Sequence, residues 1–229
     1  MIKHGIDQDA LIEKFSQATA KQGEAIRKAV NEATLKALQG RELTLANIKQ
    51  VLGTVAKAAS AGAAGSPLAA ADVEGLLAKA FAGMDGALEQ AVQANHRALQ
   101  QMVEQGVTLR ETQLKKALAD IEKMEDTLFA AVGKAASGAG ATLEGPWAGV
   151  LKAMQSKGTG TGAQASATLE QLMGNAQENL REGRALGLRA SEAMLDSYAT
   201  LVRGVFIGMS DALEQGAATS APAARSRKK

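Results

Sequence analysis

The sequence predicts an all-α, elongated protein whose long amphipathic helices pair as hairpins or as a coiled-coil-like bundle. Apolar side chains recur mostly at steps of three, four and seven residues, which is the period of a helix and not of a strand. Alanine, the best helix former, is abundant, whereas the 229 residues include only four Phe, one Trp and one Tyr. Such a composition forms helices more readily than it fills a thick core, and we expect no strand in the chain.

Residues 1–62 are predicted to form an N-terminal helical hairpin. Asp7 is of the type that caps the start of a helix, and Gly40 is of the type that ends one. A second helix is expected to begin near Thr44, with its apolar residues at helical spacing. The alanine- and glycine-rich stretch 60–67 then reads as a linker to the next helix.

Residues 66–134 are predicted to form one long amphipathic helix. A continuous helix from about Ala70 to Val132 would be roughly 90 Å long. Glycines within it weaken it and are candidates for bends, so its continuity stays open. These glycines are Gly83, Gly86 and Gly106. The apolar stripe consists of Leu77, Phe81, Met84, Leu88, Val92, Leu99, Met102, Leu109, Leu114, Leu118, Ile121, Leu128 and Val132.

Residues 135–162 are predicted to be a glycine-rich linker that carries one short helix around Trp147. The linker ends in Gly158-Thr-Gly-Thr-Gly162, which superficially resembles a phosphate-binding loop. A Walker loop requires Lys and then Ser or Thr after its last glycine, but Ala163 and Gln164 follow here. A dinucleotide-binding loop requires a preceding strand, and a helix is expected instead. We therefore expect a plain linker.

Residues 163–215 are predicted to form the C-terminal amphipathic helix. Its stripe advances by steps of four and three, as in a heptad seam. The stripe runs through Leu169, Met173, Ala176, Leu180, Gly183, Gly187, Ala190, Met194, Tyr198, Leu201, Val205, Gly208 and Ala212. Residues 216–229 lose this periodicity, and we expect them to be a disordered basic tail.

The densest apolar cluster of the chain lies near the end of the C-terminal helix, where successive apolar residues widen the stripe. Two interpretations stay open: a buried bundle or oligomer interface, or a face that docks on a hydrophobic surface. The candidate contact residues are Leu195, Tyr198, Leu201, Val202, Val205, Phe206, Met209 and Leu213. Small residues at a spacing of four let another helix approach closely. The candidates for such close packing are Gly183, Gly187, Gly204 and Gly208.

Charge and targeting patterns limit the classes of partner. The formal net charge is +2, but four of the 26 basic residues lie in the last five positions. The other 22 against 24 acidic residues leave the rest of the chain at −2, a poor match for DNA or an anionic membrane. We expect nucleic-acid contact from the tail at most. The chain lacks cysteine and shows neither a signal peptide nor a membrane span, which predicts a cytoplasmic protein.

The sequence predicts no catalytic, metal-binding or cofactor site. His4 and His96 lie far apart, without the spacing of a metal-binding helix. Carboxylates such as Glu122, Glu125 and Asp126 alternate with lysines, which is typical of an ion-paired helix surface. We therefore expect a protein that is not an enzyme and has no small-molecule substrate.

A resemblance to a known family rests on residues 165–215, ASATLEQLMGNAQENLREGRALGLRASEAMLDSYATLVRGVFIGMSDALEQ, and on the Ala-Pro-basic ending. In their Ala-, Gln- and Glu-rich helices with few aromatics and no cysteine, they resemble the phasins, bacterial proteins that coat polyhydroxyalkanoate storage granules. The resemblance implies an oligomer-forming, non-catalytic role at a granule surface and transfers no individual binding residue. Some phasins carry a long tail that binds nucleoid DNA, but this tail is much shorter. The alternative is a self-associating coiled-coil scaffold without granule binding.

Overall fold

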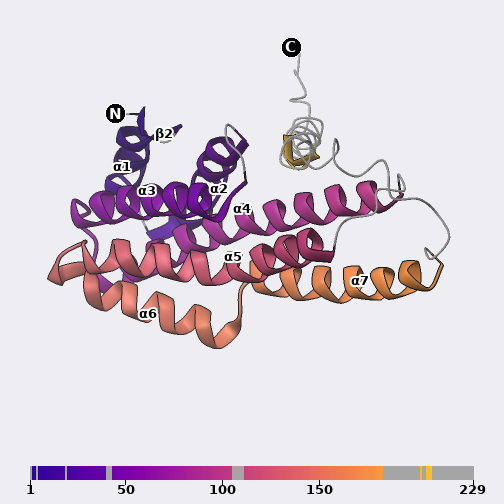
Figure 1. Cartoon of the computed structure of the whole chain (residues 1–229). Coiled ribbons are helices and arrows are strands. Elements are labelled where there is room, and N and C mark those ends of the chain that lie inside the picture. The colour runs from indigo at the N-terminus through magenta and orange to yellow at the C-terminus, as the bar shows by residue number, and fades with distance from the viewer. Residues whose placement is uncertain are drawn as a thin grey trace, which may run out of the picture.

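The computed structural model describes residues 2–3, 5–18, 20–39, 43–104, 111–182, 202 and 205–207. These residues form an all-α bundle, as the sequence predicts (Figure 1). In chain order its helices are α1 (Gln8–Ser16), the 3-10 turn η1 (Ala20–Gln22), α2 (Gly23–Gln39), α3 (Leu45–Ala64), α4 (Ala70–Glu104), α5 (Glu111–Ser137), α6 (Ala141–Lys157) and α7 (Gly160–Glu182). Among the described residues, no helix combines the length and apolar character needed to cross a bilayer.

The expectation that the chain contains no strand is wrong at its N-terminus. Two short strands, β1 (Ile2–Lys3) and β2 (Ile6–Asp7), form an antiparallel pair. Gly5 between them has a φ of 75°, a backbone conformation that glycine adopts without steric cost. The side chain of Ile6 is buried in the core, and β2 packs against α2 and α3.

Both helix starts predicted in the N-terminal hairpin are confirmed. The carboxylate of Asp7 accepts a hydrogen bond from the backbone N–H of Ala10 at 3.2 Å and caps α1. The hydroxyl of Thr44 accepts one from the backbone N–H of Asn47 at 3.2 Å and caps α3. The predicted stop at Gly40 lies outside the described residues.

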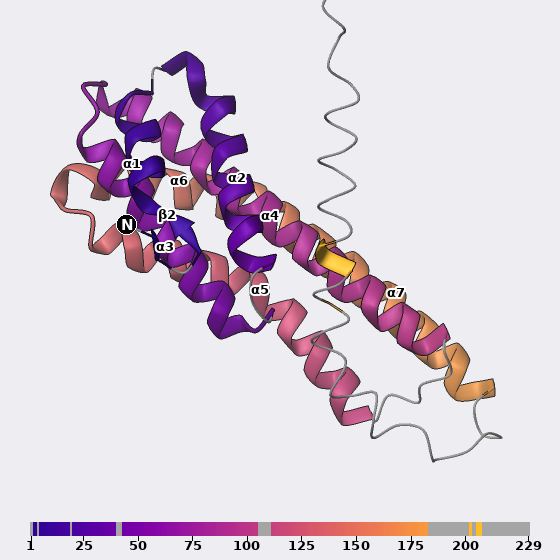
Figure 2. The ribbon, with the colours of Figure 1, turned by 90° about the horizontal axis from the view of Figure 1, so that it is seen from above.

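The prediction of one long helix over 66–134 is wrong, because α4 and α5 lie side by side and run in opposite directions (Figures 1 and 2). The rings of Phe81 and Phe129 are 5.4 Å apart, whereas 48 residues of continuous helix would separate them by about 70 Å. Folding back lets the apolar stripes of the two halves bury one another. Residues 105–110, which include Gly106, connect the two helices and lie outside the described residues.

Helix α4 is the centre of the molecule. It packs against α2, α3, α5, α6 and α7. One end of the bundle contains α1, α2, α3 and α6, and the other narrows to α4, α5 and α7 (Figure 2). The core is thin: small alanines fill much of it beside leucines, valines and a few rings.

The predicted linker over 135–162 is more ordered than expected, because it contains the 17-residue helix α6. Trp147 of α6 is fully buried, and its indole N–H donates a hydrogen bond of 3.0 Å to the hydroxyl of Ser60 in α3. The Ser60 hydroxyl in turn donates to the carbonyl of Ala56. This buried chain of hydrogen bonds fixes α6 on α3.

Two glycines permit close helix crossings in this end of the bundle. A Cβ on Gly62 of α3 would lie 2.4 Å from the Cβ of Phe15 in α1. A Cβ on Gly83 of α4 would lie 2.5 Å from the carbonyl oxygen of Arg27 in α2. Gly83 is therefore a contact point for α2 and not simply a weak position in its helix.

Candidate functional site

The predicted apolar cluster near the C-terminus is only partly described. We refer to residues 195–213 as the arm, of which the structure describes Val202 and residues 205–207. Val202 and Phe206 are buried, with 1% and 0% of their surface exposed, and Val205 is half-buried against the core. Outside the described residues lie Leu195, Tyr198, Leu201, Met209 and Leu213, and also Gly183, Gly187, Gly204 and Gly208.

The described part of the arm lies over the middle of α4 (Figures 1 and 2). Helix α7 lies on the other side of α4 in the view of Figure 1. Phe206 belongs to the same hydrophobic cluster as Leu88, Ala91 and Val92 of α4. Two segments more than a hundred positions apart in sequence therefore share one core.

A stripe of buried alanines, missed by the sequence analysis, follows the side of α4 that faces away from α7. We refer to Ala87, Ala91, Ala94 and Ala98 as the alanine stripe; each is fully buried. Asp85 of α4 faces α7. Ala94 lies about two and a half helical turns after Asp85, so Ala94 faces the side of α4 opposite to α7. The four alanines follow one another at steps of four, three and four residues. Alanine is so common in the helices of this chain that this spacing alone did not distinguish the stripe from other alanines.

Helix α7 runs parallel to α4 and is fastened to it at its first turn. The Asp85 carboxylate accepts hydrogen bonds from the backbone N–H groups of Gly160 and Thr161, at 2.8 and 2.9 Å. The Thr161 hydroxyl donates to the Asp85 carbonyl at 3.1 Å, and further along Gln93 donates to Gln164 at 3.4 Å. A carboxylate at this position satisfies N–H groups that the helix itself leaves unbonded and complements the positive end of its dipole.

This arrangement corrects the interpretation of Gly158-Thr-Gly-Thr-Gly162 as a plain linker. The Thr159 hydroxyl caps α7 by accepting from the N–H of Gly162 at 2.9 Å, and it donates to Glu125 of α5 at 2.5 Å. A Cβ on Gly162 would lie 2.5 Å from the Glu125 carboxylate, so only glycine fits without a shift. The motif therefore joins α7 to α4 through Asp85 and to α5 through Glu125. The sequence signal that could have identified this helix start was Thr159, a residue of the capping type that precedes a segment with helical periodicity.

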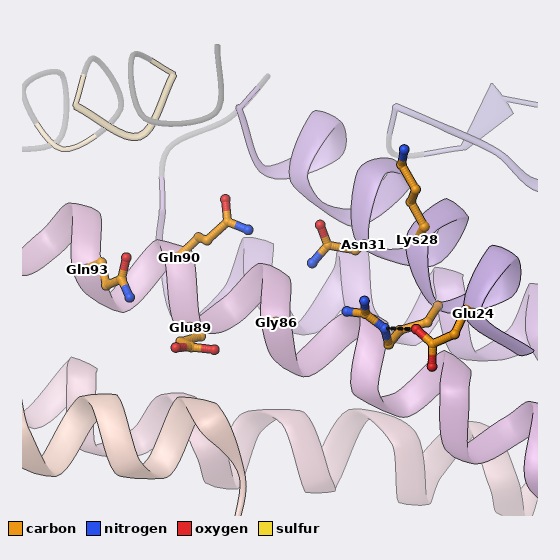
Figure 3. Close-up of a pocket in the computed structure, with 8 residues that line it drawn as sticks. Glu24, Lys28, Asn31, Gly86, Glu89, Gln90 and Gln93 are labelled. Atoms are coloured by element: carbon orange, nitrogen blue, oxygen red, sulfur yellow. Dashed lines mark hydrogen bonds and ion pairs between the residues drawn. The ribbon is translucent and has the colours of Figure 1, made fainter. Parts of the chain in front are cut away.

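An open groove of about 530 Å³ lies between α2 and α4 (Figure 3). Polar and charged side chains line it, among them Asn31, Glu89 and Gln93. Hydrogen bonds from Lys79 and then from Arg27 lower the pKa of the Glu24 carboxyl from 4.5 to about 2. Asn31 donates to the carbonyl of Gly83 at 3.1 Å. These side chains tie α2 to α4, which gives them a structural role in the wall of the groove.

His96 lies on α4, beyond the groove. Burial, and to a smaller extent the charge of Arg97, lower its pKa below the ordinary value of 6.5. Its Nε2 atom is buried and finds no hydrogen-bond partner within the described part of the chain. Among the described side chains, no group of three or more His, Cys, Asp or Glu is placed to hold a metal ion.

Fold and contacts together define a bundle of amphipathic helices around a central helix, α4, in which Val202 and Phe206 near the C-terminus are also buried. The chain belongs to a family of unknown function, DUF6781, whose model matches residues 1–215. The match includes the arm and ends before the basic tail. No curated protein and no solved structure matches the chain.

Proposed function

We propose that this protein is a non-catalytic, phasin-like coat that binds the surface of intracellular hydrophobic storage granules through its arm. The observation that carries the proposal is the apolar cluster of the arm, whose described members Val202 and Phe206 are buried completely when the arm lies on the bundle. Side chains of this kind contribute about 1.5–3 kcal/mol each when an apolar phase replaces water around them. The resemblance of residues 165–215 to phasins supports the same role.

The charges of the arm favour an uncharged surface over an anionic bilayer. Residues 195–215 carry three acidic side chains, Asp196, Asp211 and Glu214, and one basic side chain, Arg203. Helices that bind anionic lipids concentrate lysine and arginine on the polar face, because these attract the headgroups. An acidic polar face is compatible with a polyester or another neutral apolar phase.

The polar clusters of the body support a structural role for its side chains. Asp85 and Glu125 hold the first turn of α7, and Glu24 of α2 pairs with Lys79 of α4. Groups engaged in this way stiffen the bundle that would carry the arm.

The direct test is binding to poly-3-hydroxybutyrate nanoparticles, measured by co-sedimentation. We expect the wild-type protein to bind and Val205→Glu with Phe206→Glu to bind at least about tenfold more weakly, because two charges would have to enter an apolar phase. The matched control is Ala70→Glu with Ala71→Glu, which adds the same charges at exposed positions of α4. Equal binding by the arm variant and the control would disprove the role of the arm.

The second candidate is a self-associating helical scaffold without granule binding. The burial of Val202 and Phe206 favours it, since these side chains already have apolar neighbours within the protein. Light scattering separates the candidates. A stable oligomer with no affinity for the nanoparticles supports the scaffold, whereas binding that depends on Val205 and Phe206 supports the coat.

A further inference from the structure

We draw no further inference here: the strongest candidate, the open polar groove between α2 and α4, carries nothing, because the side chains that line it, such as Glu24 and Asn31, belong to the contacts that hold α2 on α4 and nothing in the described part of the chain indicates what would occupy it.

Discussion

The first half of α4 and its second half are packed in different ways. Up to Gly86, α4 is held by α2 at the Gly83 crossing and by rings such as Phe81 against Phe129. From Ala87 onward, the side of α4 away from α7 presents the buried alanine stripe. Large interlocking side chains fix one arrangement, whereas methyl groups offer a shallow surface that different segments can occupy. On the side away from α7, the second half of α4 is therefore lined by smaller side chains than the surfaces that hold its first half.

The largest effect is expected from Trp147→Ala in α6, at the end of the bundle that contains α1, α2 and α3. Removing the indole leaves a cavity and deprives the Ser60 hydroxyl of its donor, so the free energy of unfolding should fall by about 3–5 kcal/mol. Chemical denaturation monitored by circular dichroism measures it. A loss below about 1 kcal/mol would show that α6 contributes little to this end of the bundle.

The next largest effect is expected at the crossing of α1 and α3. Gly62→Val places its Cβ within 2.4 Å of the Cβ of Phe15 and 2.7 Å of the Ile12 carbonyl oxygen. Overpacking of this kind should cost about 3 kcal/mol, measured by thermal melting. Gly53→Ala in the same helix is the control, because nothing lies within 4 Å of its Cβ. It should stabilise by up to about 1 kcal/mol, and a similar loss at both positions would contradict the close crossing.

A smaller effect is expected at the junction of the two halves, from Asp85→Asn. The neutral amide keeps the size of the carboxylate but loses charge at the first turn of α7, so the free energy of unfolding should fall by about 1–2 kcal/mol. Urea denaturation measures the change. Asp72→Asn, at an exposed position in the first turn of α4, provides the comparison. Indistinguishable midpoints for the two variants would argue against the fastening role of Asp85.

The smallest effect is expected in the second half, from the pH dependence of His96. Because its pKa is lowered in the folded protein, the unfolded chain binds the proton more readily, and stability falls as pH drops below 6.5 toward the folded pKa. Thermal melts of wild type and His96→Gln between pH 8 and 5.5 measure this change. The variant should lose less stability than wild type over this pH range. If the melting temperatures of the two proteins change in parallel with pH, His96 does not contribute to the pH dependence.

The sequence was sufficient for the fold class and for local features that depend on a few neighbouring residues. The caps at Asp7 and Thr44 follow from residue type and position alone. The chain reversal between α4 and α5 was not predictable, since the apolar stripe continues with the same period on both sides. Helical periodicity reports which face is buried, and it does not report where a helix turns back.

Features made by two distant segments escaped prediction for a related reason. The glycine-rich stretch 158–162 was recognised in the sequence, but its structural role depends on contacts with Asp85 and Glu125, which belong to other helices. Similarly, the apolar arm was identified, but the buried alanine stripe of α4 could not be distinguished from the many other alanines of the chain. Which surface a segment packs against depends on the tertiary structure, so the periodicity of that segment alone does not predict it.

The parallel course of α4 and α7, clamped at Asp85, has a mechanical consequence. Tension from an anchored C-terminus reaches α7 at its far end and pulls along the helix axis. The bonds at the first turn are then loaded together, in shear, and do not open one after another like a zipper. A pull on α7 from its C-terminal end would therefore meet more resistance than a force that peels the helix sideways from α4.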